Sequence, residues 1–274
     1  RLTGVASVTT NFKNPTTYLA VNRGNANDTL TVNALPDFNA SLTIGDYVAP
    51  FKTITFAGNV AVTGSSTISA YASRNIEISS GTLSVVNGHM ELEAYGVATG
   101  TEAFKGLEIN GTLRTTGSGS IFLRGFGGNS GSDQHGIHVN AGSVESTGSG
   151  SLNFEGGGGG GAGSTNNDGI RVDGTVRATG TGNIAFTGYA GVASSSSDGV
   201  ALEPAAVINT TTGSLTVTAD WVWVGVPDGA SNYFTAGSIT FKPVTPNTPM
   251  NLGTSSDGST WGLGADKFAR FSTS

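Results

Sequence analysis

Residues 106–126 read GLEINGTLRTTGSGSIFLRGF, and this stretch decides the fold because the chain repeats it. Matching stretches are GIHVNAGSVESTGSGSLNFEGG at 136–157, GIRVDGTVRATGTGNIAFTGY at 169–189 and GVALEPAAVINTTTGSLTVTA at 199–219. The glycines that open the four stretches are 30, 33 and 30 residues apart. A weaker copy, Asn75-Ile76-Glu77-Ile78, comes one spacing earlier. A fixed period of about thirty residues indicates a linear repeat architecture.

Each unit contains three short runs in which apolar and polar residues alternate. The first run follows the opening glycine, and the third follows a turn that starts with Thr-Gly. The second run contains Leu113, Val144, Val176 and Val207 in the four units, and the third contains Ile121, Leu152, Ile184 and Leu215. Alternation over so few residues is typical of half-buried strands. We therefore predict three short strands per unit.

One such unit cannot bury its apolar face alone, but stacked units share a continuous core. The sequence therefore predicts an all-β fold, a single-stranded parallel β-helix (β-solenoid) with about 30 residues and three strands in each coil. We expect a right-handed coil, since crossover connections of that hand dominate parallel sheets. A β-sandwich is the alternative, although a sandwich does not require successive units to be copies.

The repeat is not equally clear along the chain. It is clearest over residues 76–225, and the first coils, in residues 1–75, are irregular although they still alternate as strands. We assign residues 1–235 to the solenoid. Residues 236–274 are expected to form a terminal strand or hairpin segment that continues or caps it.

The composition excludes several classes of function. A net charge of −6 with 13 scattered Lys and Arg residues argues against nucleic acid as a partner. The chain has no Cys, so it has neither disulfides nor thiolate metal sites. No run approaches the ~18 apolar residues that a membrane span needs.

Gly- and Ser-rich loops follow the third strand of each unit, at 125–135, 156–168 and 188–198. Each carries an acid close to the next strand, namely Asp133, Asp168 and Asp198. Stacking would set these carboxylates in a row, which is a candidate Ca²⁺ ladder. The alternative is ordinary turn chemistry, because Asp before Gly bonds its own backbone and Ca²⁺ needs about six to eight oxygens. We therefore expect no cofactor, with Ca²⁺ as the one candidate.

Two outward columns mix charges of opposite sign. Arg114, Glu145 and Arg177 occupy one position in consecutive units, and Glu108, His138 and Arg171 occupy another. Such pairs support the register of adjacent coils. We interpret His138 as a surface residue rather than a ligand or a base.

The candidate binding residues are Trp221 and Trp223, which alternate with Val222 and Val224. One pair should face the core and the other should face outward, where tryptophan can stack on a sugar ring or on a neighbouring subunit. The alternative is that they cover the solenoid where the repeat becomes irregular.

An enzymatic role is not expected. Parallel β-helices that cleave polysaccharides need paired acids on one face, and the aligned units show no such column apart from the loop Asp row. The motifs GxSxG, HExxH and GxxxxGK[ST] are also missing.

Both ends of the chain resemble a known class of protein. The phrases NDTLTVNALPDFNASLTI at 27–44 and TFAGNVAVTG at 55–64, with the later run from Ser238 to Phe268, are similar to repeat passages of large bacterial surface proteins, the filamentous-haemagglutinin-like adhesins. The resemblance implies export, display at the cell surface and a rod-like stalk or adhesive fibre. It assigns no functional residue.

We therefore expect an extracellular or cell-surface protein with a structural or adhesive role. Its partners would be neighbouring repeats of a longer chain, other copies of itself, or surface glycans. Two alternatives stay open: a subunit of an extracellular filament joined end to end through open strand edges, and a β-helix that binds or degrades polysaccharides.

Overall fold

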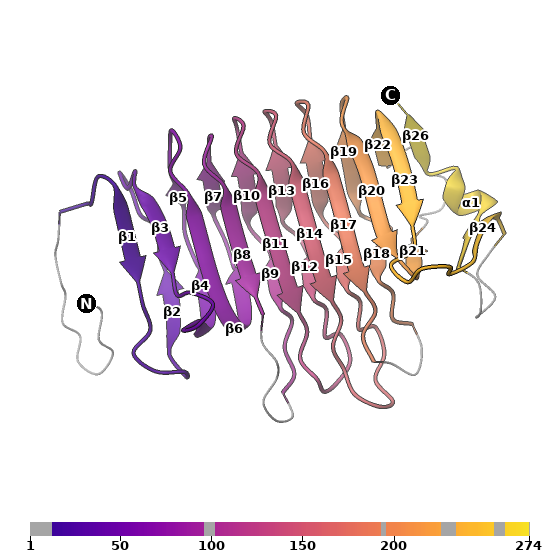
Figure 1. Cartoon of the computed structure of the whole chain (residues 1–274), viewed down its shortest axis with the longest axis horizontal. Coiled ribbons are helices and arrows are strands. Elements are labelled where there is room, and N and C mark those ends of the chain that lie inside the picture. Colours follow the sequence, from indigo (N-terminus) through magenta and orange to yellow (C-terminus); the bar gives the residue numbers. More distant parts are fainter. Residues whose placement is uncertain (1–12, 96–101, 193–195, 226–233, 255–260, 274) are drawn as a thin grey trace.

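The computed structural model describes residues 13–95, 102–192, 196–225, 234–254 and 261–273. It confirms the predicted fold: the described strands form a parallel β-helix whose coils stack along one long axis (Figure 1). Every described strand pair is parallel, and each clear coil contributes three strands to three faces of the rod.

The strands are numbered in chain order and fall into three groups, one for each face of the rod. The first face holds β2 (Thr29–Val32), β4 (Phe51–Phe56), the second half of β6 (Ile68–Ile78), β9 (Leu107–Ile109), β12 (Ile137–Val139), β15 (Ile170–Val172), β18 (Val200–Leu202) and β21 (Val222–Val224). The second holds β5 (Val60–Ala61), β7 (Thr82–Val85), β10 (Thr112–Thr115), β13 (Ser143–Ser146), β16 (Thr175–Ala178), β19 (Val207–Thr210), β22 (Phe234–Ala236) and β26 (Phe271–Thr273). The third holds β1 (Tyr18–Val21), β3 (Ser41–Ile44), the first half of β6, β8 (Met90–Ala94), β11 (Ile121–Phe126), β14 (Leu152–Gly157), β17 (Ile184–Tyr189), β20 (Ser214–Ala219) and β23 (Ser238–Lys242).

The register of the first and third faces agrees with the repeat. Ile137 pairs with Leu107 on one side and with Ile170 on the other, and Ile76 of the weak copy pairs with Leu107. The predicted column of Arg114, Glu145 and Arg177 also forms on the second face. Glu145 accepts hydrogen bonds from both arginines, at 2.7 Å from Arg114 Nη2 and 3.2 Å from Arg177 Nη2.

The prediction for the second strand of the fourth unit is wrong by one residue. Val207 pairs with Thr175 and is 38% exposed, whereas Ile208 pairs with Val176 and is fully buried. The corner before this strand contains Pro204 and is closed by the Ala206 amide, which donates to the Glu203 carbonyl. From the opening glycine to the inward residue this unit has nine residues, against seven to Val176 in the third unit and eight to Val144 in the second, so the longer corner moves the inward position from Val207 to Ile208.

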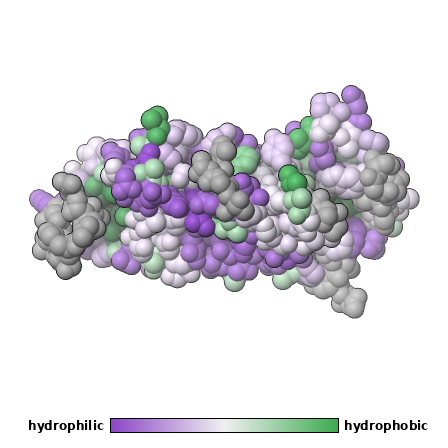
Figure 2. Space-filling model, turned by 90° about the horizontal axis from the view of Figure 1, so that it is seen from below, coloured by the Kyte–Doolittle hydropathy of each residue, from purple (hydrophilic) through white to green (hydrophobic). Residues whose placement is uncertain are grey.

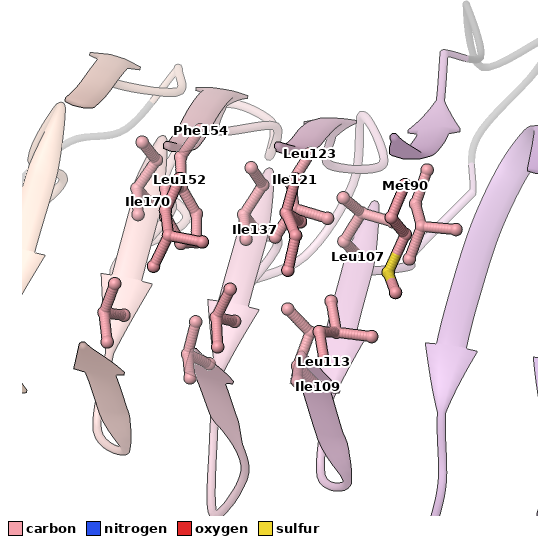
Figure 3. Close-up of a cluster of buried hydrophobic side chains, with 14 of the residues drawn as sticks. Met90, Leu107, Ile109, Leu113, Ile121, Leu123, Ile137, Leu152, Phe154 and Ile170 are labelled. Carbon is pink, nitrogen blue, oxygen red and sulfur yellow. The ribbon is translucent and has the colours of Figure 1, made fainter. Parts of the chain in front are cut away.

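The core lies inside the three faces and runs through successive coils. Figure 3 shows its inward side chains in rows along the axis, with Leu107, Ile137 and Ile170 in one row. Phe154 and Phe186 are buried on the third face with ring centroids 4.8 Å apart. They occupy the core positions that the alternation predicts.

The loops explain why coil length varies. Near the N-terminus β6 continues from the third face directly into the first. The coil there is short: Thr53 and Asn75, which are hydrogen-bonded partners in adjacent coils, are only 22 residues apart. The later coils add a loop at this corner, so that Arg114 and Glu145 are 31 residues apart. Glycines close the base of each loop: a Cβ on Gly156 would lie 2.1 Å from the Gly169 carbonyl oxygen.

The C-terminal segment continues the stacking and covers one end of the core. β23 and β26 add to the third and second faces, while β24 (Met250–Gly253) and β25 (Trp261–Gly264) form a separate pair before the short helix α1 (Ala265–Phe268). The β24–β25 pair is parallel, so these two strands do not form a hairpin. Trp261 is buried, and its indole N–H donates to the Val222 carbonyl at 3.4 Å.

Candidate functional site

A cleft of about 530 Å³ lies where the first face meets the C-terminal segment. Its walls come from β15, β18 and β21, from the ends of the loops before β15 and β18, and from β25 and α1. Trp221, Trp223, Asp168 and Asp198 all line it. The cleft therefore brings together two sets of residues that the sequence singled out separately.

The two tryptophans differ in exposure. Val222 and Val224 are the pair that faces the core, and Trp223 lies on the outer surface with 48% exposure. Trp221 is half-buried and packs partly against the core. The Lys267 ammonium of α1 lies 4.8 Å from the centre of the Trp223 ring, close enough for a cation–π contact that holds the indole in place.

Asp168 is buried beneath this surface and contacts His135 of the preceding coil. The Asp168 backbone N–H donates to His135 Nδ1 at 3.3 Å, so that Nδ1 carries no proton. Burial lowers the pKa of His135 to about 2 and raises the pKa of Asp168 to about 7. The 3.4 Å contact between the His135 ring and the Asp168 carboxyl is therefore not an ion pair near neutral pH.

Asp198 lies one coil further along, and its backbone N–H donates to Asp168 Oδ1 at 2.9 Å. Burial, followed by the nearby charge of Glu203, raises the pKa of Asp198 to about 6. Arg171 partly balances these acids, with Nη1 2.9 Å from Glu203 and 3.8 Å from Asp168. The cleft thus places carboxyl oxygens and a guanidinium group beside an exposed indole.

Asp133 does not join this row. Asp133 has a left-handed backbone (φ 60), as do Asn166 (φ 55) and Ser196 (φ 57) in the corresponding places of the next two coils. The position stacked on Asp168 is held by His135. Within the described residues, no group of three His, Cys, Asp or Glu side chains has the arrangement of a metal site. The predicted row of three carboxylates is therefore a row of His135, Asp168 and Asp198.

The interpretation of His138 as a surface residue is wrong. It is only 7% exposed, and its Nε2 lies 2.8 Å from Asp173 Oδ2. Arg171 Nε donates to the same Asp173 oxygen at 2.9 Å. Burial lowers the pKa of His138, so the ring is a neutral donor to Asp173. The outward column of the first face is therefore a connected polar network that continues into the cleft through Arg171.

Sequence reasoning missed Glu203 and Lys267 as members of this site. Glu203 follows a strand at a corner, and only the stacking brings it to Arg171 of the previous coil. Lys267 lies far along the chain, on α1. No sequence signal reports either contact, because the first depends on the stacking of two coils and the second on how the C-terminal segment folds back.

On the side of the rod that carries the loops, the described residues form no continuous hydrophobic surface. Figure 2 shows this side as hydrophilic and neutral residues with scattered hydrophobic ones. The single described helix, α1, has four residues and cannot cross a membrane.

No protein-family model, curated protein or solved structure matches this chain.

Proposed function

We propose that this chain is a structural and adhesive rod of an extracellular or cell-surface protein, and that its cleft contacts a sugar of a surface glycan. The observation that carries the proposal is the cleft itself, in which Trp223 is exposed beside Asp198, Glu203 and Arg171. An indole stacks on the apolar face of a sugar ring, while carboxyl and guanidinium groups bond its hydroxyls. The stacked coils supply a rigid support for this contact.

The C-terminal end favours this role over that of a filament subunit. Phe241 of β23, Phe271 of β26 and Trp261 of β25 form an aromatic cluster across the end of the core, with ring centroids 5.0 Å apart for Phe241–Phe271 and 5.7 Å for Phe241–Trp261. The indole N–H of Trp261 also donates a hydrogen bond to the Val222 carbonyl of β21, the last strand of the first face. Strand addition at this edge would have to displace these groups.

A binding measurement on immobilised glycans tests the proposal. We expect the chain to bind at least one glycan, and Trp223→Ala to weaken that binding at least tenfold because the stacking surface is lost. Tyr189→Ala is the matched control, since Tyr189 is an exposed aromatic residue (43%) outside the cleft. Binding that is equal in both variants, or no binding to any glycan, would refute the proposal.

A further inference from the structure

The floor of the cleft is a small side chain at an outward position of the first face. Arg171, Ala201 and Trp223 stand at the same register position of β15, β18 and β21, and all three line the cleft. Ala201 therefore forms a low floor between a guanidinium group on one side and an indole on the other. Asp198 precedes β18 and Glu203 directly follows it, so that an acidic residue stands at each end of this floor.

The guanidinium group of Arg171 is already committed to acids of the protein. Its Nη1 lies 2.9 Å from Glu203 Oε1 and 3.8 Å from Asp168 Oδ2. Its Nε donates to Asp173 Oδ2 at 2.9 Å. Three carboxyl groups thus share one cation, so an anionic ligand would gain little attraction from this side of the cleft.

Asp198 is the acid of the cleft that lacks a cation. Within the described residues, no Lys, Arg or His nitrogen forms an ion pair with its carboxyl group, whereas Asp168 and Glu203 both contact Arg171. Burial, followed by the charge of Glu203, raises the pKa of Asp198 to about 6. Asp198 lines the cleft and is only partly buried, so a bound ligand can reach it.

One ammonium group already lies at the cleft, and it belongs to the protein. Lys267 Nζ lies 4.8 Å from the centre of the Trp223 ring, and its acidic partner is Asp266 at 3.7 Å, outside the cleft lining. The face of an indole attracts cations more strongly than the other aromatic rings do. The Trp223 ring therefore accepts positive charge beside it, while the lysine leaves the Asp198 carboxyl group unpaired.

We propose that the sugar bound in the cleft carries a free amino group, as a glucosamine unit does, and that its ammonium pairs with Asp198 while its ring packs on Trp223. The inference rests on the proposed function, because it names the class of sugar for the same cleft. An ammonium group donates up to three hydrogen bonds and supplies the positive charge that Asp198 lacks. A hydroxyl or an acetamido group at the same carbon supplies no charge, so the cleft discriminates against both.

Isothermal titration calorimetry with three trisaccharides tests this inference. The probes are β-1,4-linked trimers of glucosamine, N-acetylglucosamine and glucose, which differ only in the group at C2. At about pH 6.5 and about 0.15 M salt, which screens attraction between distant exposed charges, we expect the glucosamine trimer to bind at least tenfold more tightly than the other two. Asp198→Asn keeps the shape of the side chain and removes its charge. It should lower the affinity for the glucosamine trimer at least tenfold, to that of the neutral trimers.

The chain has a net charge of −6, so a cationic sugar could also be attracted without a specific site. Glu155→Gln is the matched control, because it removes one negative charge from β14, outside the cleft, and should leave the affinity unchanged. Equal losses in Asp198→Asn and Glu155→Gln would overturn the inference.

The failure of this inference is distinguishable from the failure of the proposed function. Equal affinity for the three trimers, abolished by Trp223→Ala, would overturn the amino-sugar preference and leave the glycan contact in place. Binding of other glycans without binding of the glucosamine trimer would do the same. Binding of no glycan at all would refute both.

Discussion

Phe154 and Phe186 occupy equivalent positions in adjacent coils, and each is part of the core of both. A residue of this kind stabilises two units at once because stability in a linear repeat comes from contacts between neighbours. The alternation of apolar and polar residues was sufficient to predict both positions.

Phe186→Ala should lower the free energy of unfolding by about 3–5 kcal/mol, because it removes a fully buried ring and leaves a cavity. Chemical denaturation of the variant and the wild type measures the difference. Phe122→Ala, on the outer side of the same face, is the control and should cost less than about 1 kcal/mol. Equal losses in the two variants would mean that the register of the third face is wrong.

Asp198 should make stability depend on pH. Its pKa rises from 3.8 to about 6 in the folded chain, so its ionisation opposes folding. Stability therefore falls as the pH rises above 3.8, the pKa of Asp198 in the unfolded chain, and the fall is complete above about pH 6.

Asp198→Asn should therefore stabilise the chain at about pH 8, by on the order of 1–3 kcal/mol, and should have little effect at about pH 3. Thermal or chemical unfolding of both proteins at the two pH values measures the difference. A gain of the same size at both values would show that Asp198 ionises as freely in the folded chain as in the unfolded one.

His138 and Asp133 show where sequence reasoning stops at this scale. The outward position of His138 was predicted correctly, but its burial depends on Asp173 and Arg171, which arrive from the next coil. Asp133 stands three residues before Gly136, whereas Asp168 stands directly before Gly169, so His135 occupies the position equivalent to Asp168. A pattern along one chain gives alternation and spacing, whereas burial by neighbours requires the stacked structure.

At the scale of the element, the turns between the second and third faces are as restrictive as the strands. Gly119, Gly150 and Gly182 stack on one another, and a Cβ on Gly150 would lie 1.7 Å from the Gly119 carbonyl oxygen. The Thr and Ser side chains beside them satisfy the turn carbonyls: Thr115 donates to Gly119 at 2.7 Å and Ser146 donates to Gly150 at 2.6 Å.

Gly150→Ala should destabilise the chain by about 1–3 kcal/mol, because the added methyl group would force the adjacent turn apart. Its control is Gly161→Ala in a loop, where the nearest atom to the added Cβ would be 3.3 Å away. Thermal unfolding compares the two variants. If both retain wild-type stability, the turns are not in the close contact described above.

The elements were predicted most reliably where the units are true copies. Three strands per unit and their spacing follow from residues 106–219, and the one-residue error at Val207 arises at a corner of different length. The role of Trp261 could not be predicted, because it comes from a segment outside the repeat.

At the scale of the whole molecule, the rod combines a continuous core with a covered C-terminal end. The aromatic cluster of Phe241, Phe271 and Trp261 closes the core at the end near the cleft. This arrangement favours a rod that presents binding surfaces over a subunit that polymerises through its edges.

Electron microscopy of the purified chain over a series of rising concentrations tests this central claim most directly. The account predicts isolated short rods of one width at every concentration, because the covered end resists strand addition. Fibres that lengthen with concentration would contradict it and would make the chain a self-assembling filament subunit.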